Sequence, residues 1–157
     1  MAKVEERIKQ LGFELPEAPK PAAAYVPAVR EGMLVFTAGQ IPFINGEVKY
    51  HGKVGKDLTV EEGYKAAQVC SLNCLSVIKQ IIGDLDNIKQ ILKVNGYVNS
   101  VAEFSQQHLV LNGASELLQK VFDNGVGMHA RTAVGVNVLP LEAAVEVEMI
   151  VSLKSEK

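Results

Sequence analysis

The sequence is poor in the features that mark several common protein classes. Its 157 residues include no tryptophan and only 6% aromatic residues. No apolar run reaches about 18 residues, and the N-terminal MAKVEERIKQLGF is too charged for a secretory signal. We therefore expect a cytoplasmic protein without a membrane span. The net charge of -2 and the lack of a basic–aromatic stripe argue against binding duplex nucleic acid, anionic membranes or single-stranded RNA.

The few cysteines and histidines show no metal-binding spacing. Cys70 and Cys74 lie one helical turn apart in AAQVCSLNCLSVIKQII, but a structural zinc site needs four ligands and no histidine lies nearby in the sequence. We expect both cysteines to be small core residues. His51 and His108 stand alone, and we expect His129 to have a surface role at the mouth of a strand. The sequence thus predicts no metal site.

What the sequence does contain is a regular alternation of strands and helices. The expected elements are an N-terminal helix (3–13), two strands around the turn REG (25–42), a glycine-rich loop (43–59), a helix from the capping box Thr59/Glu62 to Gly83, a strand (88–100), a helix open to interruption at LNG (101–122), and two strands joined at Pro140 (130–138 and 143–153). This order predicts one α+β domain over 1–157, with 1–19 as a helix and extended lead-in. Two helices are expected to cover one face of a mainly antiparallel sheet. The second face then needs a partner, which favours an oligomer.

The strand in MHARTAVGV carries a single charge. Alternation puts Arg131, Ala133, Gly135 and Asn137 on one face and Thr132, Val134, Val136 and Val138 on the other. This pattern predicts a half-buried strand. A guanidinium is a fixed fork of donors that grips a carboxylate, and small neighbours leave room for one.

The final strand in AAVEVEMIVSL adds acidic side chains. Glu146 and Glu148 alternate there with valines. If the last two strands pair as a hairpin, Arg131 and Glu146 share one side of the sheet. Two interpretations remain open. One is a structural Arg–Glu pair, in which desolvation offsets the attraction, and the other is a ligand pocket.

These segments resemble one known family. HARTAVGVNVLPLEAAVEVEMI, with TAGQIP and Tyr25, is similar to the reactive intermediate deaminases (RidA/YjgF, also labelled endoribonuclease L-PSP), over about residues 20–154. The resemblance implies a chorismate-mutase-like (YjgF-like) fold. It also implies a homotrimer with three active sites in the clefts between subunits.

The resemblance also implies roles for individual residues. Arg131 matches the arginine that binds the carboxylate of an imino or enamino acid, and Glu146 matches the glutamate that positions the hydrolytic water. The implied substrate-binding residues are Tyr25, Gly39, Thr37 (beside Ala38, where members often have serine) and Ala133, where the best-known members have cysteine.

The implied reaction is hydrolysis of a 2-imino or 2-enamino acid to a 2-oxo acid and ammonia. It needs a held substrate, a placed water and a base, and no metal or organic cofactor. Two alternatives stay open. The same pocket would serve a non-catalytic regulator that binds a small carboxylate. The older family label implies an endoribonuclease, against which stand the charge of -2 and histidines without an evident catalytic partner.

Overall fold

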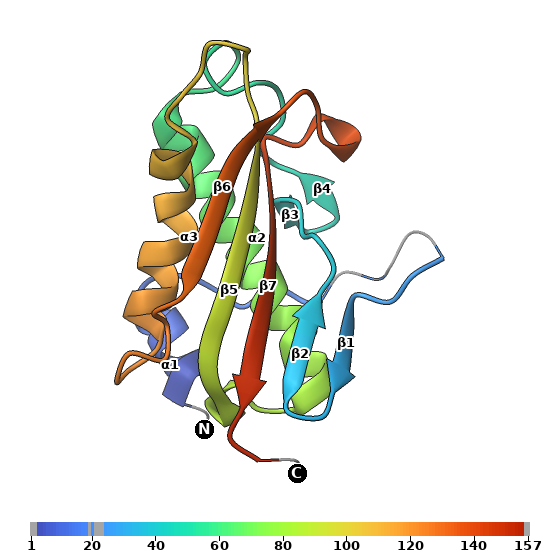
Figure 1. Ribbon diagram of the computed structural model, residues 1–157, viewed down its shortest axis with the longest axis vertical. Coiled ribbons are helices and arrows are strands. Elements are labelled where there is room, and N and C mark those ends of the chain that lie inside the picture. Colours follow the sequence, from blue (N-terminus) through green and yellow to red (C-terminus); the bar gives the residue numbers. More distant parts are fainter. Residues whose placement is uncertain (1–2, 19, 21–23, 156–157) are drawn as a thin grey trace.

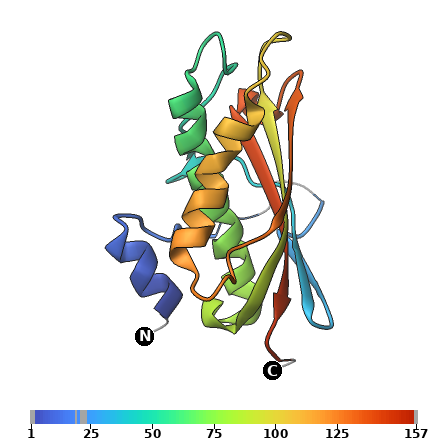
Figure 2. The ribbon, with the colours of Figure 1, turned by 60° about the vertical axis from the view of Figure 1, so that its left-hand side comes forward.

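Helices cover one face of a five-stranded sheet, and the opposite face is open (Figure 1 and Figure 2). The computed structural model describes residues 3–18, 20 and 24–155. The strand order is β1-β2-β7-β5-β6, with β1 (Ala28–Glu31), β2 (Leu34–Thr37), β7 (Val145–Leu153), β5 (Ile88–Asn99) and β6 (Ala130–Val136). The α-helices are α1 (Lys3–Gln10), α2 (Val60–Ile82) and α3 (Gln107–Val121). This arrangement confirms the predicted α+β class with a mostly antiparallel sheet.

The last two strands do not pair with each other, so the condition for Arg131 and Glu146 to share one side of the sheet is not met. β6 pairs with β5 in parallel, and β7 pairs with the other edge of β5 in the antiparallel sense. The chain that leaves β5 crosses over through α3 before it enters β6, and a strand–helix–strand crossover yields parallel strands. The connection at Pro140, which includes a short 3-10 helix (Pro140–Glu142), therefore joins strands on either side of β5.

The predicted limits of α2 are confirmed. The Oγ1 of Thr59 accepts a hydrogen bond from the N–H of Glu62 at 3.1 Å, and the Glu62 carboxylate accepts one from the N–H of Thr59 at 2.7 Å. At the other end, Gly83 adopts a φ of 80° and ends the helix. Although α2 has 23 residues, no helix in the described part of the chain is long and apolar enough to cross a membrane.

Helix α3 begins later than predicted and is not interrupted at LNG. Residues 101–106 form a turn and extended chain before the helix starts at Gln107. A Cβ added at Gly113 would lie 2.1 Å from the carbonyl oxygen of Tyr64 on α2. Gly113 therefore marks the point where two helix backbones cross closely, rather than a break.

The segments outside the sheet follow the sequence signals. The predicted N-terminal helix is present as α1, and its first N–H groups, from Lys3 and Val4, donate to the Asp86 carboxylate at 2.8 and 3.0 Å. Asp86 belongs to a 3-10 turn (Leu85–Asn87) after α2, so a distant part of the chain caps this helix. The glycine-rich loop contains a small hairpin of β3 (Phe43–Ile44) and β4 (Glu47–Val48), which turns at Asn45 and Gly46 with positive φ.

Cys70 and Cys74 lie in the core, as predicted. Both side chains are fully buried, and their thiols donate to the carbonyl oxygens of Val145 (3.4 Å) and Val147 (3.3 Å) on β7. Burial raises the pKa of both thiols, that of Cys74 to about 12. The helix–sheet contact therefore has two unreactive thiols at its centre.

We expect neither thiol of the folded protein to react with a disulfide reagent at pH 8 during the time in which the denatured chain reacts completely. The thiolate is the nucleophile, and burial both suppresses it and blocks access. Titration with and without denaturant checks this. Equal rates in the two states would contradict the burial of Cys70 and Cys74.

Candidate active site

The two faces of the sheet differ in chemistry. On β7 the side chains directed toward the helices are apolar and buried: Val145, Val147, Met149 and Val151. Those on the open face are half-exposed: Glu146, Glu148, Ile150 and Ser152. Residues paired across neighbouring strands share a face, so the register extends this division over the whole sheet.

Arg131 and Glu146 lie on opposite faces of the sheet. Arg131 is paired with Val94, which is paired with Met149, and this places Arg131 on the helix-covered face. Glu146 is paired with Tyr97 on the open face. The two residues would share one side only in a β6–β7 hairpin, and β5 lies between those strands.

The Arg131 guanidinium is held by three acceptors on α3. Its Nη1 donates to the Oδ1 of Asn112 at 2.9 Å and to the Oγ of Ser115 at 3.1 Å, and its Nη2 donates to the carbonyl oxygen of His108 at 3.2 Å. Burial lowers the pKa of Arg131, but arginine stays charged in proteins. Within the described chain, the Nε–H and one Nη2–H have no partner. Two such N–H groups suit a bidentate carboxylate.

The Glu146 carboxylate lies half-buried on the open face beside a second acidic group. Burial, and then the charge of Glu148, raise the pKa of Glu146. The Oε1 of Glu148 accepts hydrogen bonds from the Tyr97 hydroxyl (2.7 Å) and the Asn95 amide (3.1 Å), whereas Glu146 makes no hydrogen bond to any described residue. Glu146 is therefore a carboxylate of increased basicity that is free to engage a water molecule.

Gly39 lies directly against Glu146. A Cβ added at residue 39 would be 2.2 Å from the Oε1 of Glu146. The segment is fixed there because Gln40 and Val147 exchange backbone hydrogen bonds of 2.8 and 3.0 Å. The structure thus brings together two of the predicted site residues, which are distant in the sequence.

The remaining predicted site residues are placed elsewhere. Tyr25 precedes β1, is 54% exposed and makes no hydrogen bond to a described residue. The Oγ1 of Thr37 accepts from the N–H of Met149 at 3.0 Å and donates to the Sγ of Cys74 at 3.8 Å, so its hydroxyl is engaged in the core and does not face the open surface. Ala133 lies on the helix-covered face and packs against the core.

One glycine on β6 and one on β5 lie close against neighbouring side chains. A Cβ at Gly135 would lie 2.8 Å from the Nε2 of Gln107 and 2.9 Å from the Oγ of Ser100. On the neighbouring strand, a Cβ at Gly96 would lie 2.0 Å from the Cδ1 of Leu111. Gly135 therefore lies close to the side chains of Gln107 and Ser100, and the three residues line one surface hollow of the chain.

Sequence reasoning missed the residues that surround Arg131. His129 is half-buried, not at the surface, with its Nε2 2.9 Å from the Oγ of Ser115 and its Nδ1 2.7 Å from the carbonyl oxygen of Gly127. One signal was present in the sequence: Asn112 and Ser115 are three residues apart, so they share a face of the helix. Ser115 falls between the apolar residues Leu111 and Leu118 of that helix, and a polar side chain at such a position indicates a bonding partner.

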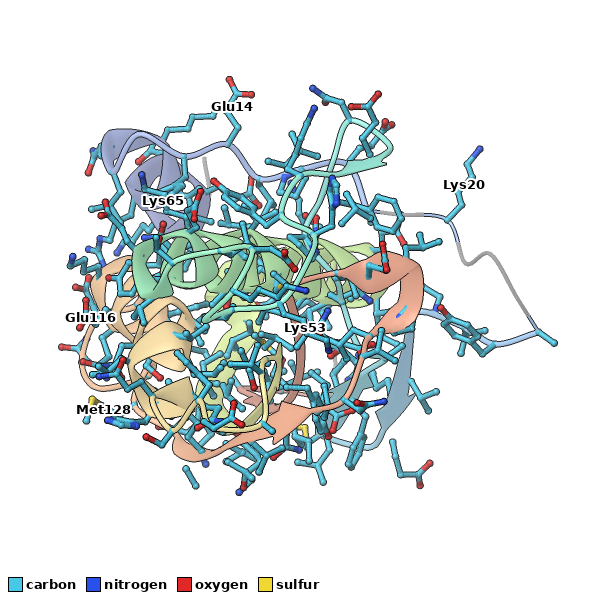
Figure 3. The ribbon with its side chains drawn as sticks, turned by 90° about the horizontal axis from the view of Figure 1, so that it is seen from above. Glu14, Lys20, Lys53, Lys65, Glu116 and Met128 are labelled. Carbon is cyan, nitrogen blue, oxygen red and sulfur yellow. The ribbon has the colours of Figure 1, made fainter. Side chains whose placement is uncertain are left out.

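Two hollows are found on the described part of the chain. One hollow of about 710 Å³ lies between α1 and α2, beside Lys9 and Lys79. Another, of about 570 Å³, lies beside Lys53 and Gln107 at the end of the molecule that Figure 3 shows. Neither hollow includes Arg131 or Glu146. Among the described residues no three His, Cys, Asp or Glu side chains come together to hold a metal ion.

The protein is a two-layer α+β sandwich in which one face of the sheet is open. The anchored Arg131 lies on the helix-covered face, and the acidic pair Glu146 and Glu148 lies on the open face. Residues 5–153 match the family model described as YjgF/chorismate mutase-like, putative endoribonuclease. The chain belongs to this family.

Three relatives show how far the likeness extends. The chain is 43% identical over 153 residues to Protein TCP17 of Trypanosoma cruzi, covering 98% of this chain and 96% of that protein. The crystal structure of Atu1372, a protein of unknown function from Agrobacterium tumefaciens, is 42% identical with a TM-score of 0.90 (97% and 94% of the two chains). A putative endoribonuclease from Shewanella oneidensis MR-1 is 34% identical with a TM-score of 0.92 (96% and 99%).

Proposed function

We propose that this protein hydrolyses reactive 2-imino or 2-enamino acids to the 2-oxo acid and ammonia. The observation that carries the proposal is the Arg131 guanidinium, which α3 anchors with two N–H groups left over. An anchored guanidinium loses little further side-chain entropy when it binds, and two spare N–H groups match the two oxygens of a carboxylate. The substrate class follows from the family resemblance and from this carboxylate clamp.

The active site would be shared between two protomers. Arg131 and Glu146 lie on opposite faces, so they act on one substrate only where two chains meet. The open face offers surface for such contact: Val29 is 52% exposed, Phe36 39% and Val134 40%. Exposed apolar side chains on a sheet face favour association. In a homotrimer, Arg131 of one protomer would face Gly39 and Glu146 of the next.

The chemistry needs only positioning and one base. Arg131 holds the substrate carboxylate, which fixes the imine carbon beside Glu146 of the neighbouring protomer. Glu146 accepts a proton from water as the water oxygen bonds to that carbon. The C=N π electrons pass to the nitrogen, which takes a proton from solvent. Glu146 then returns its proton to the amino group of the resulting amino alcohol, the C–N bond breaks to release ammonia, and the hydroxyl group loses its proton to solvent as the C=O bond of the 2-oxo acid forms. A carboxylate of raised pKa is the stronger base for this step.

The same arginine would also serve a protein that binds a small carboxylate without turning it over. Such a regulator needs Arg131 but not Glu146. The endoribonuclease named in the family description is less compatible with this chain, because the acidic pair Glu146 and Glu148 on the open face repels phosphate. Turnover therefore separates the enzyme from the regulator.

Replacing Arg131 by alanine should lower kcat/KM for an imino acid by about tenfold to a hundredfold, the value of charge-assisted hydrogen bonds at this site. An amino-acid oxidase generates the imine in the cuvette, and semicarbazide traps what is not hydrolysed. Wild type should reduce the semicarbazone signal, and Arg131→Ala should do so far less. The matched control is Arg30→Ala on the edge strand β1, which should behave as wild type. If the wild-type protein leaves the semicarbazone signal unchanged for several amino acids, the deaminase proposal is contradicted. The carboxylate-binding regulator is then the remaining proposal.

A further inference from the structure

We propose that Ser115 and His129 form a positioning pair that holds the Arg131 guanidinium ready for a carboxylate and releases it when the imidazole is protonated. The inference rests on the proposed role of Arg131. It assigns functions to two residues outside the proposed reaction steps. It is carried by a continuous chain of contacts from Gly127 through His129 and Ser115 to Arg131.

The hydrogen-bond directions along this chain follow from its two ends. The Gly127 carbonyl only accepts, so the Nδ1 of His129, 2.7 Å away, carries the ring hydrogen. In the neutral ring Nε2 is then an acceptor and takes the hydroxyl hydrogen of Ser115 at 2.9 Å. This turns the lone pairs of Ser115 toward the Nη1 of Arg131 at 3.1 Å. With the His129 ring neutral, each hydrogen bond in this chain therefore has a single donor and a single acceptor.

The chain controls which donors of Arg131 remain available. With Ser115 and Asn112 accepting from Nη1, and the His108 carbonyl accepting from Nη2, the free N–H groups are the Nε–H and one on Nη2. If Ser115 did not accept, Nη1 would have an unused donor and the guanidinium could turn about its side-chain torsions. The pair therefore acts by fixing the orientation of a binding group.

Protonation of His129 reverses the direction of the hydrogen bond between Ser115 and the Nε2 of His129. The imidazolium Nε2–H would then donate to Ser115, and two cations would share one hydroxyl oxygen. Burial, and then the nearby Arg131 charge, lower the pKa of His129, so the neutral ring is the form that the fold favours.

Other charges stand apart from the ring. Glu116 and Lys120 of α3 are exposed, and Glu116 accepts a hydrogen bond from Tyr64. Lys93 of β5 donates to Thr132 on the open face. Among the described residues, Arg131 is thus the charge that acts on His129.

The test follows the two side chains directly, because Glu146 also titrates on the acid side and would obscure an activity profile. Long-range ¹H–¹⁵N spectra of the labelled protein report the His129 tautomer, and the Arg131 Nε–H signal reports the guanidinium. We expect the Nδ1–H tautomer at pH 7.5, and an Arg131 signal that shifts with the same midpoint as His129, below the ordinary histidine value of 6.5. His129→Gln should abolish this pH dependence. The exposed His51→Gln should leave it unchanged.

Steady-state kinetics provide a second test of the Ser115–His129 pair. Ser115→Ala removes one hydrogen bond to a charged group, so KM for the imino acid should rise about tenfold while kcat changes less than about twofold. An Nε2–H tautomer, or an Arg131 signal that ignores the His129 titration, would overturn the positioning pair. Coupled His129 and Arg131 signals in a wild type that turns over no imine would support the pair and reject the deaminase instead.

Discussion

Gly39→Ala is expected to lower kcat/KM for an imino acid by about a hundredfold or more, within the usual contribution of a general base. The new Cβ would lie 2.2 Å from the Oε1 of Glu146 and 2.8 Å from its Cδ, so the carboxylate must turn away from its present position. The atoms displaced are the end of a flexible side chain, so the fold should survive with nearly unchanged stability. Steady-state kinetics and thermal unfolding measure the two effects separately.

The control for Gly39→Ala is a double substitution. If the alanine acts by moving the carboxylate, Gly39→Ala combined with Glu146→Gln should be no less active than Glu146→Gln alone, since both changes remove the same group. Additive losses would show that residue 39 acts through something other than Glu146. A Gly39→Ala protein with wild-type activity would remove Glu146 from the chemistry as described.

The second large effect concerns stability. Gly113→Ala should lower the free energy of unfolding by about 2–3 kcal/mol, because overpacking outweighs the better helix propensity of alanine. The added Cβ would lie 2.1 Å from the carbonyl oxygen of Tyr64 and 2.9 Å from its carbonyl carbon. These are backbone atoms, so relief requires α2 and α3 to move apart. Urea unfolding measures the change.

Gly63→Ala is the matched control for this helix crossing. It makes the same substitution within α2, but its Cβ would meet side-chain atoms, with the Cγ1 of Val110 at 3.1 Å. Those atoms can shift, so we expect a loss below about 1 kcal/mol. Equal losses at the two positions would contradict the close backbone crossing at Gly113.

The elements that the sequence predicts well are those with local signals. The Thr59/Glu62 capping box and Gly83 each lie within a few residues of the helix end that they fix. The alternation in β7 correctly separates Glu146 and Glu148 from the buried valines. Local patterns do not state which strand lies beside which, so the position of β5 between β6 and β7 was not predictable from alternation alone.

The site was predictable in its residue types but not in its arrangement. The orientation of Arg131 depends on Asn112, Ser115 and the His108 carbonyl. All three belong to α3, the helix that connects β5 to β6. The alternation in β6 does not show that Gly135 lies close to Gln107 of α3 and to Ser100. Gly39 and Glu146 meet only through the pairing of distant strands. Such contacts follow from tertiary structure and leave no local pattern.

The central claim is that each active site takes Arg131 from one protomer and Glu146 from another. Arg131→Ala and Glu146→Gln chains, each of strongly reduced activity alone, are unfolded together in equal amounts and refolded, and imine hydrolysis is measured. A closed ring of randomly mixed chains should recover about one quarter of the activity of wild type treated in the same way, because that fraction of interfaces combines both intact residues. Activity that stays at the level of the two parents, while refolded wild type is active, would contradict the shared site.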